Sequence, residues 1–289
     1  HTVRFVPLGV RGSTPAPGSE FVRYGGHTSC VAVYADGADV PDLLLDAGTG
    51  LRMLPALLAG AAFKGRIVLS HLHWDHVQGL PFCPSVDNPR AQVSLYVPVE
   101  NPDTDPEGLL AQGFSPPNFP IGPDGLLGEW QFCPLLPGAI DDTVTVATVA
   151  HKGGTAVGIR VTLDGAVLAY LPDHALHDET PAAARADAER LAAGADVLLH
   201  DGQFVAAEHS TARAYGHATI ETVLEFADRC GVGALVLTHH GPARTDDQLD
   251  ELAGRFHRTP QGRPVSFAQQ NTSIEVTARS PVQGRRQVG

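Results

Sequence analysis

Four side chains of types that bind transition metals fall within six residues of this sequence. His71, His73, Asp75 and His76 come directly after residues 67–70, an apolar run that predicts a strand. On a turn that leaves a strand, the first two histidines can point to one side while Asp75 and His76 point to another. This density and placement favour a site for two neighbouring cations over a surface histidine cluster or a set of helix-capping histidines.

Three further candidate ligands also follow predicted strands. They are His151 after residues 143–150, Asp173 after residues 166–171, and His239 after residues 234–238. Taken alone, each is better explained as a structural histidine or a turn-forming aspartate. Because α/β proteins commonly place their sites where strand ends meet at one edge of a sheet, the shared placement of all three favours one common site.

The composition describes a globular chain with an acidic surface. Of its 289 residues, 43% are hydrophobic and 18% are charged, and the formal net charge is −12. No apolar run approaches the roughly 20 residues that cross a bilayer, so we expect no membrane partner. Long nucleic acids are gripped by Lys and Arg that neutralise phosphates, so the net charge argues against them and leaves a small anionic substrate held by metals.

The cysteines indicate a reducing compartment. Cys30, Cys83, Cys133 and Cys230 are widely spaced, without a Cys-x-x-Cys pair, and the N-terminus shows no signal segment. We therefore expect reduced thiols that bind no metal, in a cytoplasmic protein.

The elements that must position these residues are short strands mixed with a few helices. Strands are predicted at residues 3–8, 30–35, 43–46, 67–70, 93–97, 143–150, 156–163, 166–171, 197–199 and 234–238, and helices at 180–194, 220–227 and 245–256. Such alternation predicts sheets covered by helices, and we expect a single domain over residues 1–276.

Two segments differ in kind. Residues 101–137 are rich in proline with interleaved aromatic residues, which predicts a long loop, either a lid over a cleft or an ordered surface excursion. Residues 277–289 are polar and are expected to form a mobile tail.

The motifs carry a family resemblance. The sequence resembles the metallo-β-lactamase superfamily, and within it the ribonuclease Z-like branch that includes bacterial cyclic-nucleotide phosphodiesterases. The matching stretches are Gly9-Val10-Arg11-Gly12-Ser13, Leu45-Asp46-Ala47-Gly48-Thr49-Gly50, His71-Leu72-His73-Trp74-Asp75-His76, His151-Lys152-Gly153-Gly154, Leu171-Pro172-Asp173-His174, His200-Asp201-Gly202-Gln203, Tyr215-Gly216-His217 and Leu237-Thr238-His239-His240. The resemblance implies an α/β fold, an αββα sandwich of two mixed sheets flanked by helices.

The resemblance also implies a metal site with seven ligands. One ion is held by His71, His73 and His151, the other by Asp75, His76 and His239, and Asp173 bridges both. His239 is preferred to His240 because the branch places its last ligand directly after Thr238. The ions implied are two divalent cations, Zn²⁺ first, with Mn²⁺ or Fe as alternatives.

Three further residues receive roles by the same resemblance. His217 is implied to face the substrate phosphate and to protonate the leaving alkoxide, and Asp201 to position it. Asp46 is implied to support the ligands without binding metal. Asp75, besides binding metal, is placed to accept a proton from a metal-bridging water.

The expected function is hydrolysis of small phosphodiesters such as cyclic nucleotides, by a metal-bridging hydroxide. Ester, lactone or β-lactam hydrolysis on the same fold, and a non-hydrolytic biosynthetic accessory role, stay open as alternatives. A flavodiiron oxidoreductase is disfavoured, because its motif has Glu where this chain has His73. Position 218 is Ala where the branch has Ser, and position 27 is His where Asn is expected. A homodimer is left open.

Overall fold

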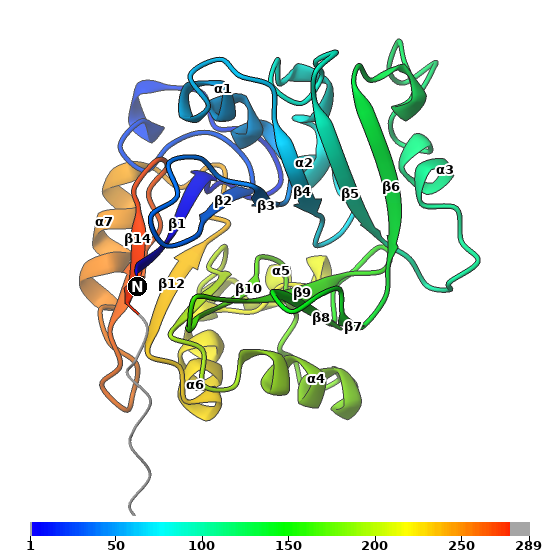
Figure 1. The fold of residues 1–289 in the computed structure, drawn as a ribbon. Coiled ribbons are helices and arrows are strands. Elements are labelled where there is room, and N and C mark those ends of the chain that lie inside the picture. The colour runs from blue at the N-terminus through cyan, green and yellow to red at the C-terminus, as the bar shows by residue number, and fades with distance from the viewer. Residues whose placement is uncertain (1, 278–289) are drawn as a thin grey trace, which may run out of the picture.

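Two seven-stranded mixed sheets face each other and carry helices on their outer faces (Figure 1). The structure is a computed structural model that describes residues 2–277. The first sheet has the order β14-β1-β2-β3-β4-β5-β6 and the second β13-β12-β11-β10-β9-β8-β7. In the first sheet β3 to β6 run parallel, and in the second β10 to β13 run parallel. The αββα sandwich expected from the sequence is therefore present.

The strands are short and, apart from β14, which pairs with β1, they follow chain order across each sheet. They are β1 (Thr2–Gly9), β2 (Cys30–Tyr34), β3 (Leu43–Leu45), β4 (Lys64–Val68), β5 (Gln92–Pro98), β6 (Glu129–Leu135), β7 (Gly138–Ala139), β8 (Val144–Thr148), β9 (Val157–Leu163), β10 (Ala166–Leu171), β11 (Val197–Asp201), β12 (Ala234–Thr238), β13 (Val265–Phe267) and β14 (Ile274–Thr277).

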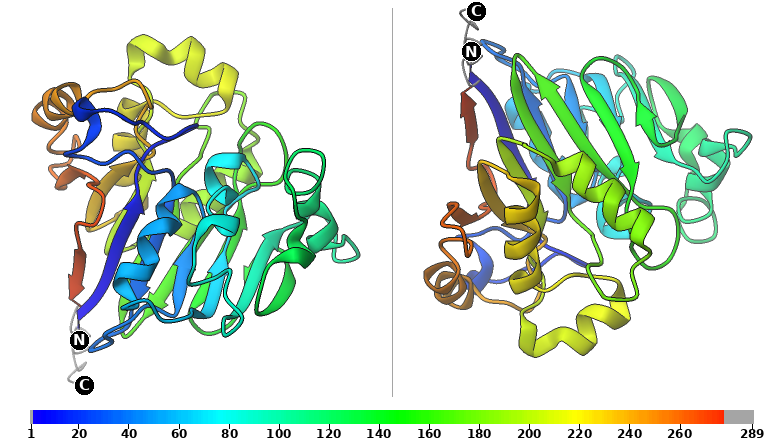
Figure 2. Two further views of the ribbon diagram at one scale, coloured as in Figure 1. Left: turned by 90° about the horizontal axis from the view of Figure 1, so that it is seen from above. Right: turned by 90° about the horizontal axis from the view of Figure 1, so that it is seen from below.

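Helices cover the two outer faces, as the views from above and below show (Figure 2). They are α1 (Leu54–Leu57), α2 (Trp74–Val77), α3 (Pro106–Ala111), α4 (Ala182–Ala192), α5 (His209–Tyr215), α6 (Ile220–Cys230) and α7 (Asp246–Arg255). The first three lie on the side of the first sheet, and α4 and α6 lie under the second.

Alternation along the strands divides the core into three apolar layers. Leu43 and Leu45 point between the sheets, whereas Leu44 points to the outer layer of the first sheet. In the second sheet Leu199 points between the sheets and Leu198 packs towards α4 and α6. Because successive strand side chains face opposite sides, continuous apolar runs are needed wherever both faces are covered, which is why these strands read so clearly in the sequence.

All ten predicted strands and the three predicted helices are confirmed, most of them with shifted ends. The strand β4, predicted at residues 67–70, begins at Lys64 and ends at Val68. There the Ser70 amide donates to the Asp46 side chain at 2.7 Å instead of continuing the ladder. The chain is thus released from the sheet two residues before the His-rich run.

The prediction of a loop over residues 101–137 is wrong in part. This segment contains α3 and the strand β6, which pairs in parallel with β5 along its whole length. The prolines of this segment led to the prediction of a loop where the structure has β6. Pro134 is tolerated in this strand because β6 lies at the edge of its sheet. Of the tail predicted at residues 277–289, Thr277 ends β14, and residues 278–289 lie outside the described part of the chain.

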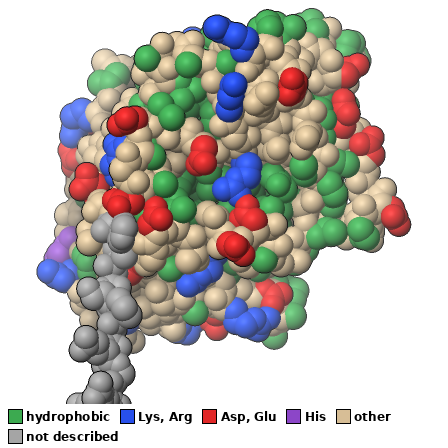
Figure 3. Space-filling model, viewed as in Figure 1, with side chains coloured by type: hydrophobic (Ala, Val, Ile, Leu, Met, Phe, Trp, Pro, Cys, Tyr) green, Lys and Arg blue, Asp and Glu red, His purple; other side chains and the backbone are tan. Residues whose placement is uncertain are grey.

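Within residues 2–277, no helix has the length and apolar character needed to cross a membrane. On the face drawn in Figure 3, acidic and basic side chains are interspersed rather than gathered into one basic patch.

Candidate metal centre

The predicted ligands come from strand ends of both sheets and meet at one edge of the sandwich. His71 and His73 lie on the turn after β4, and Asp75 and His76 lie in α2, which follows at once. Because the chain changes from extended turn to helix at His73, the two pairs point in different directions. The other three ligands follow strands of the second sheet: His151 follows β8, Asp173 follows β10 and His239 follows β12.

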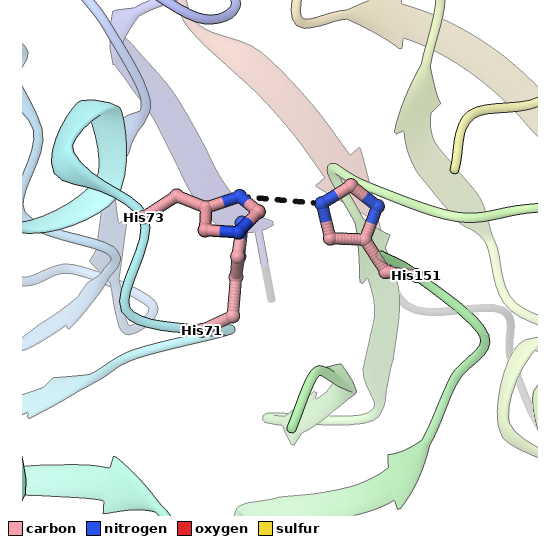
Figure 4. A group of neighbouring side chains, drawn as sticks. All are labelled: His71, His73 and His151. Atoms are coloured by element: carbon pink, nitrogen blue, oxygen red, sulfur yellow. Dashed lines mark hydrogen bonds between the residues drawn. The ribbon is translucent and has the colours of Figure 1, made fainter. Parts of the chain in front are cut away.

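One group of ligand atoms consists of three histidine nitrogens. The donor atoms of His71, His73 and His151 lie within 4.8 Å of one another. His151 Nε2 is 3.3 Å from His73 Nδ1, and both rings converge with His71 on the same space (Figure 4). Nε2 of His71 is buried without a hydrogen-bond partner. Buried ring nitrogens normally have a partner, so this arrangement fits a metal ion as the partner of the three nitrogens.

The second group combines a carboxylate with two histidines. Asp75, His76 and His239 also place their donor atoms within 4.8 Å of one another. Oδ2 of Asp75 lies 3.1 Å from His239 Nε2 and 3.4 Å from His76 Nε2. The two ring nitrogens are 3.4 Å apart.

Asp173 faces both groups with different oxygens. Its Oδ1 lies 3.4 Å from His151 Nε2 and 3.9 Å from His71 Nε2. Its Oδ2 lies 3.0 Å from His76 Nε2 and 3.3 Å from His239 Nε2. A carboxylate in this position has the geometry to bridge two ions.

Asp46 and Gly216 hold ligand rings from behind. Asp46 lies 2.8 Å from His76 Nδ1 and also accepts the hydroxyl of Tyr170 at 2.8 Å. The Gly216 carbonyl accepts from His151 Nδ1 at 2.7 Å. Such partners fix the ring orientation and leave the other nitrogen for a metal. The supporting place predicted for Asp46 agrees with this geometry.

The electrostatics of the cluster favour a positive charge among the carboxylates. Burial lowers the pKa of His71, and the neighbouring His76 lowers it further. Burial also opposes charge on His76, but Asp75, Asp46 and Asp173 outweigh it and raise the pKa of His76 well above its usual value. The carboxylates thus stabilise a cation at this place, and a metal ion would supply one.

His217 lies beside the cluster and is oriented by Asp201. The two side chains meet at 2.7 Å between His217 Nδ1 and Asp201 Oδ2, and both are buried. Burial lowers the pKa of His217, but Asp201 outweighs it, and the value rises to about 9. Because α6 begins at Ile220, His217 lies before the helix, and Asp201 rather than the helix dipole dominates its surroundings.

Other histidines near the site have structural partners. His240 donates away from the cluster to the Ala268 carbonyl at 2.9 Å, which agrees with the preference for His239. His174 packs against Phe226 and lies 2.9 Å from His200. His27, at a position that departs from the branch, lies 3.1 Å from the Thr49 hydroxyl.

A cavity of about 740 Å³ opens over the cluster. Sequence reasoning assigned no role to Ser13 or Gln203, which line it, although both stand in stretches that carry the resemblance. The Ser13 amide donates to Asp75 Oδ2 at 2.7 Å, and Gln203 donates to the Ser13 hydroxyl at 3.1 Å. The seven side chains therefore meet beneath an open cavity, and their metal binding stays a prediction.

Comparison with known proteins agrees with this arrangement. The sequence model of the β-lactamase superfamily domain matches residues 42–240, more than half of the chain. Ribonuclease Z from Exiguobacterium is 45% identical over 73 residues, 24% of each protein, so the chain spans about a quarter of that relative. Ribonuclease Z from Bradyrhizobium is 26% identical over 268 residues, with 72% of this chain and 82% of that protein covered.

Solved structures share the whole fold. The metallo-β-lactamase fold protein YhfI from Bacillus subtilis is 19% identical with a TM-score of 0.67, covering 96% of this chain and 100% of that one. A diphosphatase from the PhnP family is 18% identical with a TM-score of 0.69 and the same coverage. At this identity the likeness shows the architecture of two sheets and flanking helices.

Proposed function

Because this chain belongs to the metallo-β-lactamase superfamily, we propose that it is a metal-dependent hydrolase of small phosphodiesters, cyclic nucleotides among them. The observation that carries this proposal is the position of Asp173, whose two oxygens face separate groups of histidine nitrogens. The names of its relatives, ribonuclease Z and a diphosphatase, support phosphate esters as the substrate class.

The residues fit two divalent cations, Zn²⁺ first. Five imidazoles and two carboxylates form the set, and the buried Nε2 of His71, which faces the cluster, has no hydrogen-bond partner. Mixed nitrogen and oxygen donors suit zinc, with Mn²⁺ and Fe as alternatives. When bound, two such ions supply an activated water at neutral pH and neutralise charge on the phosphate oxygens.

His217 is the proton donor in this proposal. With Nδ1 held by Asp201, its Nε2 faces the cavity, 3.8 Å from Asp173 Oδ1. A raised pKa keeps the ring protonated near neutral pH, so the ring can donate a proton to the departing alkoxide. Asp201 keeps the ring in that orientation and balances its charge.

Asp75 has two roles to reconcile. Burial would raise its pKa, but His76 and His239 outweigh burial and hold the pKa well below the usual range. A weakly basic carboxylate is a better ligand than proton acceptor. The accepting role expected for Asp75 from the sequence therefore stays a prediction, secondary to its place among the ligands.

A small substrate fits the surroundings better than a long nucleic acid. Among the described residues that line the cavity over the cluster, there is neither Lys nor Arg. The net charge of −12 argues against an extended track for a phosphate backbone, and on the face drawn in Figure 3 acidic side chains lie among the basic ones. The phosphate would be held by the ions and by His217.

The test is turnover of bis(p-nitrophenyl) phosphate by protein loaded with Zn²⁺, Mn²⁺ or Fe²⁺ in turn. We expect hydrolysis with at least one ion, and none after chelation. A panel of aryl esters, lactones and β-lactams serves as comparison. Turnover confined to that panel would replace the phosphodiester assignment, and turnover of nothing by metal-loaded protein would favour a non-hydrolytic role.

A further inference from the structure

A second cavity, of about 500 Å³, lies beside the one over the metal cluster. Leu72 and Trp74 line both cavities, so the two are adjacent and Trp74 stands at their boundary. Trp74 is 73% exposed although it lies between His73 and Asp75. Neither metal binding nor the shape of α2 requires a large aromatic side chain there, and an exposed tryptophan at a cavity mouth is typical of a ligand contact.

The wall of this second cavity that is formed by α3 and the residues after it is apolar. Leu109, Leu110 and Phe114 lie there, Val77 of α2 adds a fourth apolar side chain, and the uncharged polar residues of the lining include Thr104, Gln112 and Thr155. Gly113 brings this wall close to the indole, because a Cβ there would lie 3.7 Å from Trp74 Nε1. The cavity is therefore a slot with the Trp74 indole on one side and the apolar side chains of the α3 segment on another.

Among the described residues, no cationic side chain lines this slot. Glu100 is the only ionisable side chain that lines it, and neither Lys nor Arg does. The first two positions of α3 offer no free amide hydrogen in place of a cation. Pro106 has no amide hydrogen, and the Glu107 amide donates to the Asp105 side chain. A phosphate group in the slot would face Glu100 without a compensating charge.

We infer that this slot binds an uncharged aromatic or aliphatic ester group of the substrate, stacked on Trp74. The substrate class is then a monoanionic phosphodiester with one apolar arm, and compounds with a second phosphate on that arm are disfavoured. The position of the reacting phosphate at the ligand cluster rests on the proposed function. The preference of the slot itself rests on Trp74, Glu100 and the apolar wall.

Methylphosphonate monoesters test the slot directly, and product analysis after each titration checks that their one remaining ester bond is intact. Phenyl, ethyl and 2-phosphoethyl esters of methylphosphonate are titrated into metal-loaded protein by calorimetry. The phenyl ester should bind roughly tenfold more tightly than the ethyl ester, the scale of one aromatic stacking contact. The 2-phosphoethyl ester should bind more weakly than the ethyl ester.

Fluorescence reports where the phenyl group goes. The chain has two tryptophans, so Trp130→Phe leaves Trp74 as the only emitter. In that variant, the phenyl ester should change the tryptophan emission at the concentrations that saturate binding. Absence of any change, or equal binding of the phenyl and ethyl esters, overturns the inference.

Matched variants separate the two walls of the slot. Trp74→Ala should abolish the preference for the phenyl ester, Trp74→Phe should retain most of it, and Leu127→Ala, another exposed apolar residue, should leave it unchanged. Glu100→Lys should tighten binding of the 2-phosphoethyl ester by roughly two- to thirtyfold, the effect of exchanging one exposed repulsion for an attraction. Glu251→Lys, with the same change of net charge on the exposed side of α7, should have no such effect.

The same protein distinguishes failure of the inference from failure of the proposed function. Hydrolysis of bis(p-nitrophenyl) phosphate without any preference among the phosphonates overturns the slot and leaves the phosphodiesterase. A phenyl preference that depends on Trp74, without hydrolysis of any phosphodiester, supports the slot and removes the proposed reaction.

Discussion

Nδ1 of His217 lies 2.7 Å from Oδ2 of Asp201, and the pair is buried beside the ligand cluster. Asp201 ends β11, whereas His217 lies between α5 and α6, so the contact joins a rigid strand end to a connecting segment. This pairing orients one imidazole nitrogen towards the cavity, and we therefore expect the loss of His217 to separate chemistry from metal binding.

His217→Ala is expected to keep the metal content and to lower kcat/KM on an alkyl phosphodiester roughly a hundredfold or more, the scale for one lost general acid. An aryl phosphodiester should lose less, because a good leaving group needs no proton. Rates on both substrates are measured with metal analysis in parallel. An equal, small loss on both would assign His217 a structural role.

Asp173→Ala should damage both metal content and rate more than His174→Ala. Asp173 contacts both groups of ligand nitrogens, whereas His174 faces His200 and Phe226. His174 is fully buried, so its replacement can also reduce the amount of folded protein. For both variants we therefore measure the metal bound per folded chain and the rate per bound metal. Comparable losses in the two variants would show that the bridging residue is wrongly assigned.

Elemental analysis should find about two transition-metal ions per chain, as expected for a seven-ligand site. Chelation should lower Tm, because an ion that binds only the folded state stabilises that state. A bound ion would also give buried atoms such as His71 Nε2 a partner. Replacing the metal should restore Tm. A stoichiometry near zero that does not rise on reconstitution would contradict the dinuclear site.

Asp46→Asn should weaken metal binding by roughly 10- to 100-fold, the usual cost of losing a partner behind a ligand. His76 Nδ1 and the Tyr170 hydroxyl contact one oxygen of Asp46, and the Ser70 amide donates to the other, so the amide nitrogen of Asn would face a donor in either orientation. Competition with a fluorescent chelator measures the affinity. Asp42→Asn, exposed just before β3, is the matched control, and an equal effect there would refute the role of Asp46.

Gly12→Ala should reduce activity and metal affinity although Gly12 is not itself a ligand. A Cβ at this position would lie 2.4 Å from His239 Nδ1 and 2.9 Å from Gln203 Oε1, so His239 must move. Gly254→Ala in α7 meets nothing within 4 Å and should leave both quantities unchanged. Wild-type kinetics in Gly12→Ala would show that His239 tolerates the shift.

One error of sequence reasoning has a clear physical origin. The strand β6 was hidden because an edge strand needs neither apolar residues on both faces nor an amide at every position, so its proline-rich sequence resembles a loop.

The sequence by itself determined the local features of this protein: the dense run from His71 to His76, the apolar strands before each candidate ligand, and the family motifs. These are readable because spacing of a few residues fixes which side chains share a turn. Only the tertiary structure decided which oxygen of Asp173 faces which histidine and that His240 turns away to Ala268. It alone brought α3 beside Trp74 to form the apolar slot. Such contacts join segments far apart in the chain, and their geometry depends on how the two sheets pack, which no local pattern encodes.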